Sequence, residues 1–135
     1  MASFPLKIVT ADGLIFDGMA EKVIVRTTAG DTAILARHIN CVYPLGMGRA
    51  VVEINGERKT AACIGGMLNV INGAATLVPT SFEWAEDIDL VRAQESARAA
   101  EEMLQKRSEL SPQEIAMAEA KLKRALIRQN VHQGE

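Results

Sequence analysis

Three arginines near the C-terminus could bind a polyanion. Arg92 lies in one predicted helix, and Arg124 and Arg128 are four residues apart in the next. Guanidinium groups match phosphate oxygens through paired hydrogen bonds, so a convergence of these side chains would favour a phosphate-bearing ligand. A simpler interpretation is that the charges complement helix dipoles and form exposed ion pairs, each contributing about 0–1 kcal/mol. Spacing by itself leaves both interpretations open.

Patterns that would indicate catalysis are scarce. The two histidines, His38 and His132, are far apart in the sequence, and no cysteine–histidine spacing resembles a zinc site. Gly65-Gly66 lacks the Lys-Ser/Thr of a phosphate-binding loop, and Gly46-Met47-Gly48 lacks the third glycine of a dinucleotide fingerprint. These glycines indicate bulges or tight turns between strands. We therefore expect no enzymatic activity and no metal site, and a contact or structural role for His38.

Composition narrows the class of protein further. The chain has 135 residues, 48% of them hydrophobic, and a formal net charge of −2, which argues for a folded core and against a dedicated nucleic-acid binder. No apolar run approaches the roughly 18–20 residues that span a bilayer, and the first residues do not resemble a secretory signal. We expect Cys41 and Cys63 to be reduced, buried thiols in a cytosolic protein.

The elements that must position these residues differ between the two halves of the chain. Nine of the ten glycines lie in residues 1–80, where short apolar runs are separated by turn signals every 8–12 residues. The pairs Asn55-Gly56 and Asn72-Gly73 each separate two such runs, and Asn-Gly is a strong signal for a two-residue hairpin. This half therefore predicts an antiparallel β-sandwich or barrel.

The second half predicts two helices packed as an antiparallel hairpin. Ser111-Pro112, with Glu114 following, is a helix start with a capping box. Two stripes at three- and four-residue spacing are dominated by alanine: Leu90, Ala93, Ala97, Ala100 and Leu104, then Ile115, Ala118, Leu122 and Ala125. Alanine buries little area, so this hairpin should be marginally stable by itself. The predicted fold is α+β, with residues 1–82 as a β-sandwich and residues 83–135 as the helical hairpin.

Four segments of the chain resemble the epsilon subunit of bacterial F-type ATP synthases. They occur in the same order over essentially the whole chain: residues 12–18 (DGLIFDG), 28–38 (TAGDTAILARH), 62–66 (ACIGG) and 88–93 (IDLVRA). One departure lies just before His38, where the family commonly has Pro-Gly and this chain has Ala36-Arg37. Four motifs in this order are specific to the family.

The resemblance implies a ten-stranded sandwich followed by a helix-turn-helix. It implies a non-catalytic rotor subunit of the central stalk, which couples ion-driven rotation to ATP synthesis. The sandwich would bind the gamma subunit and the c-ring, and the hairpin would fold down or extend toward the alpha and beta subunits, inhibiting ATP hydrolysis when extended. The protein would be peripheral at the cytoplasmic face of the bacterial membrane, without inserting into it. The alternative is a stand-alone ATP-sensing module.

The resemblance also implies roles for particular residues. Some family members bind ATP on the folded hairpin through an Ile/Leu-Asp-x-x-Arg-Ala motif and arginines of the second helix. The matching or similar positions here are Ile88, Asp89, Arg92, Ala93, Arg124 and Arg128, with Glu83 as a further contact. ATP would then be a regulatory ligand and no cofactor would be required. Asp31 and His38 are the expected partner contacts of the sandwich.

Overall fold

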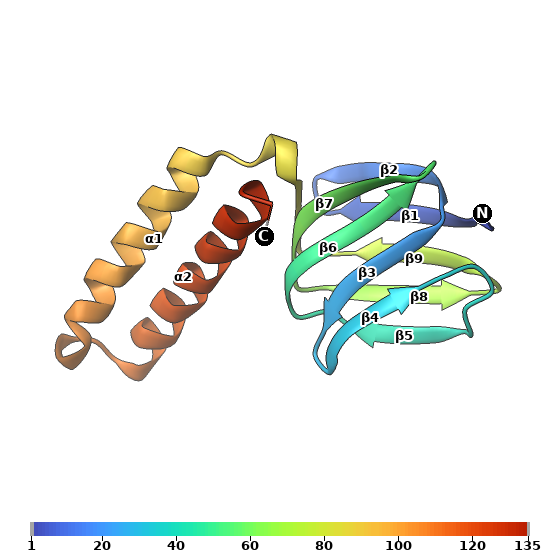
Figure 1. Cartoon of the computed structure of the whole chain (residues 1–135). Coiled ribbons are helices and arrows are strands. Elements are labelled where there is room, and N and C mark those ends of the chain that lie inside the picture. Colours follow the sequence, from blue (N-terminus) through green and yellow to red (C-terminus); the bar gives the residue numbers. More distant parts are fainter. Residues whose placement is uncertain (1, 135) are drawn as a thin grey trace. The chain divides into compact units, whose positions relative to one another are not determined.

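The computed structural model describes residues 2–134 and divides into two compact units, one ending at Trp84 and the other beginning at Ala85 (Figure 1). The first unit is a sandwich of two five-stranded sheets, with orders β2-β1-β9-β8-β5 and β10-β7-β6-β3-β4. In the described chain the strands are β1 (Phe4–Thr10), β2 (Gly13–Ala20), β3 (Lys22–Thr27), β4 (Gly30–Ile34), β5 (Cys41–Pro44), β6 (Met47–Ile54), β7 (Glu57–Ile64), β8 (Met67–Ile71), β9 (Ala74–Val78) and β10 (Ser81–Trp84).

Alternation along the strands builds the core of the sandwich. In β1, Phe4, Leu6 and Ile8 are at most 2% exposed while the residues between them face outward. Because alternate side chains of a strand point to opposite faces of the sheet, one face of each sheet contributes its side chains to the core. Leu68 of β8 and Val52 of β6 meet in this cluster from opposite sheets. The predicted α+β fold, a sandwich followed by two packed helices, is confirmed.

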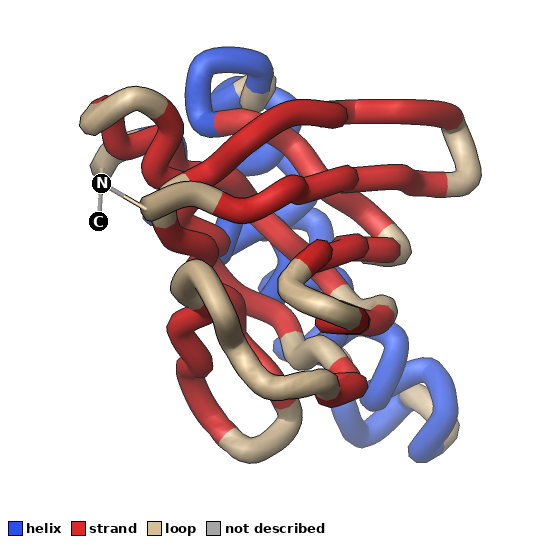
Figure 2. The backbone as a smooth tube through the Cα atoms, turned by 90° about the vertical axis from the view of Figure 1, so that its right-hand side faces the viewer, coloured by secondary structure: helices blue, strands red, loops and turns tan. Residues whose placement is uncertain are grey.

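Both predicted Asn-Gly hairpins are present. Asn55-Gly56 joins β6 to β7 and Asn72-Gly73 joins β8 to β9, and all four residues have positive φ, as a two-residue turn of this kind requires. Figure 2 shows the turns in tan between the red strands. The pairing is antiparallel except between β1 and β9, which run parallel from Leu6 opposite Ala75 to Ile8 opposite Leu77.

Gly65 and Gly66 form the corner where the chain leaves one sheet for the other. Their φ values are +66° and +98°, and they connect β7 of the second sheet to β8 of the first. The return connection from β9 to β10 passes against this corner through Val78 and Pro79. The glycines are therefore a tight turn between strands, as the sequence indicated.

The cysteines differ in burial. Cys63, on β7, is 4% exposed, and burial raises the pKa of its thiol to about 12. Cys41 is only partly buried, so the prediction of two buried thiols is wrong for this residue. The reason is its place on β5, an edge strand with β8 as its single neighbour. Both cysteines are unbridged in the described chain.

The second unit contains the two predicted helices. A 3-10 turn, η1 (Ala85–Asp87), leads to α1 (Leu90–Gln105), and η2 (Arg107–Glu109) separates α1 from α2 (Pro112–His132). Ser111 and Glu114 form the predicted capping box, with both hydrogen bonds at 3.1 Å. The buried residues of the helices are nearly all small: Ala93, Ala97, Ala100, Ala118, Ala125 and Val131.

Candidate functional site

The motif at residues 88–93 forms the start of α1, and most of its residues have structural roles. Asp89 is the N-cap, and its carboxylate accepts a hydrogen bond from the backbone N–H of Arg92 at 3.0 Å. Ile88 and Ala93 are 6% and 4% exposed, so they pack rather than face solvent. Arg92 is exposed and is the residue of this motif best placed to meet a ligand. An aspartate immediately before a helical pattern of apolar residues is a signal for an N-cap. The sequence analysis did not assign this role to Asp89.

The line of contact between α1 and α2, here called the seam, determines which flank of the hairpin carries the arginines. The Gln129 side-chain amide donates to the backbone carbonyl of Ala93 at 3.5 Å, which places the start of α1 beside the end of α2. Arg92 comes one residue before Ala93, and Arg128 comes one residue before Gln129. Consecutive residues are separated by about 100° around a helix axis. Because the helices are antiparallel, a residue that immediately precedes a seam residue in either helix lies on the same flank of the hairpin.

The same argument places Arg124, one residue before buried Ala125, on this flank. Lys121 precedes the half-buried Leu122, so it lies on the same flank as the arginines. The interpretation based on arginines alone missed this residue. Arg98 follows Ala97 by one residue and lies on the opposite flank. We call Arg92, Lys121, Arg124 and Arg128 the cationic flank. Its four positive side chains could bind phosphate oxygens.

Glu83 does not belong to the helical unit. It lies in β10, where it pairs with Ala62 of β7 in the second sheet. The strand continues to Trp84, whose ring stacks edge-on against Phe82 with centroids 4.9 Å apart and carries the Lys59 ammonium 4.4 Å above it. These contacts hold β10 in place up to the last residue of the sandwich. A contact between Glu83 and a nucleotide stays a prediction.

The expected partner contacts, Asp31 and His38, lie on the sandwich. Asp31 of β4 accepts a hydrogen bond from Arg26 Nε at 2.6 Å, and this pairing raises the pKa of the Arg26 guanidinium above its ordinary value. Both side chains are more than half exposed, so the pair contributes little to stability. It does present two fixed, opposite charges at the edge of a sheet.

His38 lies in the loop between β4 and β5, where its Nε2 is 3.5 Å from the Tyr43 hydroxyl. Partial burial raises the pKa of Tyr43, with a smaller contribution from the Cys41 side chain. Arg37 precedes the histidine with a φ of +64°, in the left-handed region that favours glycine. Arg37 therefore adopts a left-handed backbone conformation although it is not a glycine.

Groups for metal chemistry are missing from the part of the chain that the structure describes. No three His, Cys, Asp or Glu side chains among residues 2–134 are grouped so that they could hold a metal ion. Among the same residues, no helix is both long enough and apolar enough to cross a bilayer. The candidate sites are thus a cationic flank and a pair of surface contacts.

The fold defines a protein of two parts, a β-sandwich followed by an α-helical hairpin. The protein-family model described as "ATP synthase, Delta/Epsilon chain, beta-sandwich domain" matches residues 3–85, and "ATP synthase, Delta/Epsilon chain, long alpha-helix domain" matches residues 86–133. The chain belongs to the ATP synthase delta/epsilon chain family. It is an epsilon-type central-stalk subunit and is not itself catalytic.

Individual relatives agree with this assignment. The chain is 38% identical to the ATP synthase epsilon chain of Bacillus velezensis over 131 residues, which cover 97% of this chain and 98% of that protein. It is 41% identical to the epsilon chain of Alkaliphilus metalliredigens over 107 residues, covering 78% and 80%. A chain in the Euglena gracilis mitochondrial ATP synthase shares the fold, with a TM-score of 0.68 and 21% identity over 98% of this chain and 79% of that one.

Proposed function

We propose that this subunit couples rotation to ATP synthesis through its sandwich and regulates ATP hydrolysis through its hairpin. The sandwich would bind the gamma subunit and the c-ring, and the hairpin would reach the alpha and beta subunits when extended. The observation that supports this best is the division into two compact units at Trp84 and Ala85. A docking element and a regulatory element need such independence. The complex would place the protein at the cytoplasmic face of the bacterial membrane.

The packing of the hairpin suits a regulatory element. Its buried residues are five alanines and Val131, and each alanine methyl contributes only about 0.8 kcal/mol on burial. Rearranging such a seam requires a modest free-energy difference between states. A hairpin with a large aromatic or leucine core would resist the same change.

Removal of the hairpin tests the proposal. A protein of residues 1–86 keeps every strand of the sandwich, because β10 ends at Trp84. We expect it to co-purify with gamma as the full chain does, and to relieve inhibition of ATP hydrolysis in the reconstituted catalytic head. Failure of the full chain to bind gamma would contradict the docking role. Equal inhibition by both forms would contradict the regulatory role.

Asp31 and His38 are proposed to contact gamma or the c-ring. Asp31 lies at the start of β4, and His38 lies in the loop that follows its other end. Asp31 is exposed and His38 is half-buried, so both side chains reach the surface of the sandwich. Asp31→Ala and His38→Ala should weaken co-purification with these partners, whereas Arg58→Ala, an exposed change on β7, should not. Equal binding by all three variants would remove these residues from the interface.

ATP is proposed as a regulatory ligand of the cationic flank, with no cofactor required for the stalk role. The support is the common placement of Arg92, Arg124 and Arg128 one residue before the seam. Ile88, Asp89 and Ala93 would form the helix start that positions Arg92, and Glu83 would be a further contact.

Calorimetric titration of ATP tests this second site. Arg92→Ala should reduce ATP affinity about tenfold, since a hydrogen-bonded charge contributes about 1.5–3 kcal/mol. Arg98→Ala removes the same charge from the opposite flank of the same helix and should leave affinity nearly unchanged. No ATP binding by the unmodified protein would remove the ATP site and leave the stalk role. ATP binding without gamma binding would favour the stand-alone sensor.

A further inference from the structure

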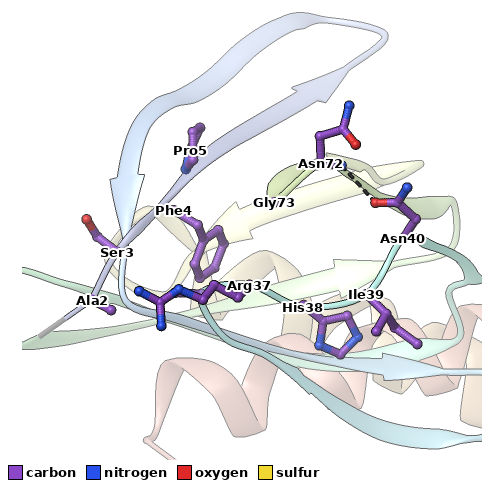
Figure 3. Close-up of a pocket in the computed structure, with 11 residues that line it drawn as sticks. Ala2, Ser3, Phe4, Pro5, Arg37, His38, Ile39, Asn40, Asn72 and Gly73 are labelled. Carbon is purple, nitrogen blue, oxygen red and sulfur yellow. Dashed lines mark hydrogen bonds between the residues drawn. The ribbon is translucent and has the colours of Figure 1, made fainter.

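A cleft of about 630 Å³ lies in the sandwich beside the loop that carries Arg37 and His38. Its walls come from the start of β1, the loop between β4 and β5, and the β8–β9 turn (Figure 3). This volume is within the range of small-ligand sites. Its eleven lining residues include Arg37 and His38 but no aspartate or glutamate. The charge of the lining therefore favours an anion.

Arg37 supplies the permanent positive charge of the cleft. Within residues 2–134, no hydrogen bond or ion pair occupies its guanidinium. Its backbone has a φ of +64°, where glycine would be at ease, so an arginine is held in an unfavourable conformation. Backbone strain of this kind is found where a side chain must be presented at a particular place.

Neutral donors complete the lining. Asn40 Oδ1 accepts a hydrogen bond from the backbone N–H of Asn72 at 2.8 Å, which ties the loop to the β8–β9 turn (Figure 3). Asn40 and Ser3 add an amide and a hydroxyl donor to the lining, with Asn40 across the pocket from the guanidinium (Figure 3). Phe4, 2% exposed, closes the floor and keeps this end of the cleft rigid. A guanidinium with amide and hydroxyl donors is a donor set suited to phosphate oxygens.

We propose that this cleft binds the phosphate group of a phosphate ester, carried by a lipid headgroup or by a small soluble molecule. The two apolar residues beside Arg37 on the same loop, Leu35 and Ile39, are 50% and 74% exposed. Exposed apolar side chains around a cation are typical of surfaces that meet lipid headgroups. The inference concerns the sandwich alone and does not rest on the proposed role of the hairpin or of the stalk.

Two probes applied to the full chain at constant ionic strength test the proposal. Titration with inorganic phosphate or glycerol 3-phosphate, followed by NMR, should shift the amide signals of Asn72 and Gly73. Co-sedimentation with phosphatidylcholine vesicles, with and without phosphatidylglycerol, tests the lipid source. Binding of the soluble phosphates identifies a small-molecule site, and binding of the vesicles without them identifies a lipid site.

Matched variants distinguish the cleft from general charge attraction. Arg37→Gly removes the guanidinium and suits the backbone at that position, so the variant should fold and lose about tenfold in affinity. Arg58→Gln removes one exposed charge from β7 and should change affinity less than about twofold. Equal losses in both variants, or no response to any probe, would overturn the proposal. Signals shifting only in the helices would do the same.

Discussion

Replacing Gly66 with alanine should destabilise the sandwich far more than alanine at any hairpin turn. The new Cβ would lie 2.1 Å from the Val78 carbonyl oxygen and 2.6 Å from Pro79 Cα. Both neighbours are backbone atoms in the connection between β9 and β10, so rotation of a side chain cannot relieve the clash. One of the two connections between the sheets must move by about 1.4 Å, because non-bonded contacts of this kind become comfortable near 3.5 Å.

The magnitude follows from two separate costs. Backbone displacement in a close-packed region costs about 1–3 kcal/mol, and a φ of +98° costs an alanine about 1–3 kcal/mol more. We therefore expect a total loss of about 2–6 kcal/mol. That is a large fraction of the roughly 5–15 kcal/mol that keeps a domain folded. For a unit of this size the melting temperature should fall by at least about 8 °C.

Gly56→Ala is the matched control. Gly56 also has a positive φ, +78°, but no atom lies within 4 Å of the position its Cβ would take. It should lose only about 1 kcal/mol, from backbone conformation. Chemical denaturation followed by the fluorescence of Trp84, the single tryptophan, measures both variants. A Gly66→Ala protein as stable as the Gly56→Ala protein would refute the steric argument.

Three further outcomes follow from the structure. Asp89→Ala should remove the N-cap of α1 and lower its stability by about 1 kcal/mol in thermal unfolding, whereas Asp89→Asn should retain the cap. In the folded protein at pH 8, Cys63 should resist alkylation because burial raises the pKa of its thiol to about 12, whereas Cys41 should react. Mass spectrometry counts the labels, and fast labelling of both cysteines would contradict the burial of Cys63. Hydrogen bonds from the Ser111 backbone and side chain hold the pKa of Glu114 below its ordinary value of 4.5. The Glu114 carboxylate therefore stabilises α2 above pH 4.5, and this stabilisation is lost as the pH falls through the lowered pKa. Glu114→Gln should flatten this pH dependence in helicity measured by circular dichroism.

The candidate sites divide into what spacing predicts and what needs coordinates. Arg92, Arg124 and Arg128 could be selected from charge and residue type, because guanidinium groups suit phosphate. The N-cap role of Asp89 was also accessible, since it depends on the residues immediately following. The predicted stripes also suffice to put Lys121 and Arg98 on opposite flanks of an antiparallel hairpin. How closely Arg92 and Arg128 approach along that flank needed coordinates, because it depends on which residue of α2 lies beside Ala93.

Local pattern alone determined the two kinds of structure in this chain and their order. The Asn-Gly pairs defined hairpins and the Ser111 capping box defined a helix start, because turns and caps are set by residues within a few positions of each other. The tertiary structure decided what depends on contacts distant in sequence. The parallel pairing of β1 with β9, the place of Cys41 on an edge strand paired only with β8, and the cleft at Arg37 each depend on segments more than twenty residues apart. Strand order and the space between loops are fixed by packing across the two sheets, and this packing leaves no short-range signal in the sequence.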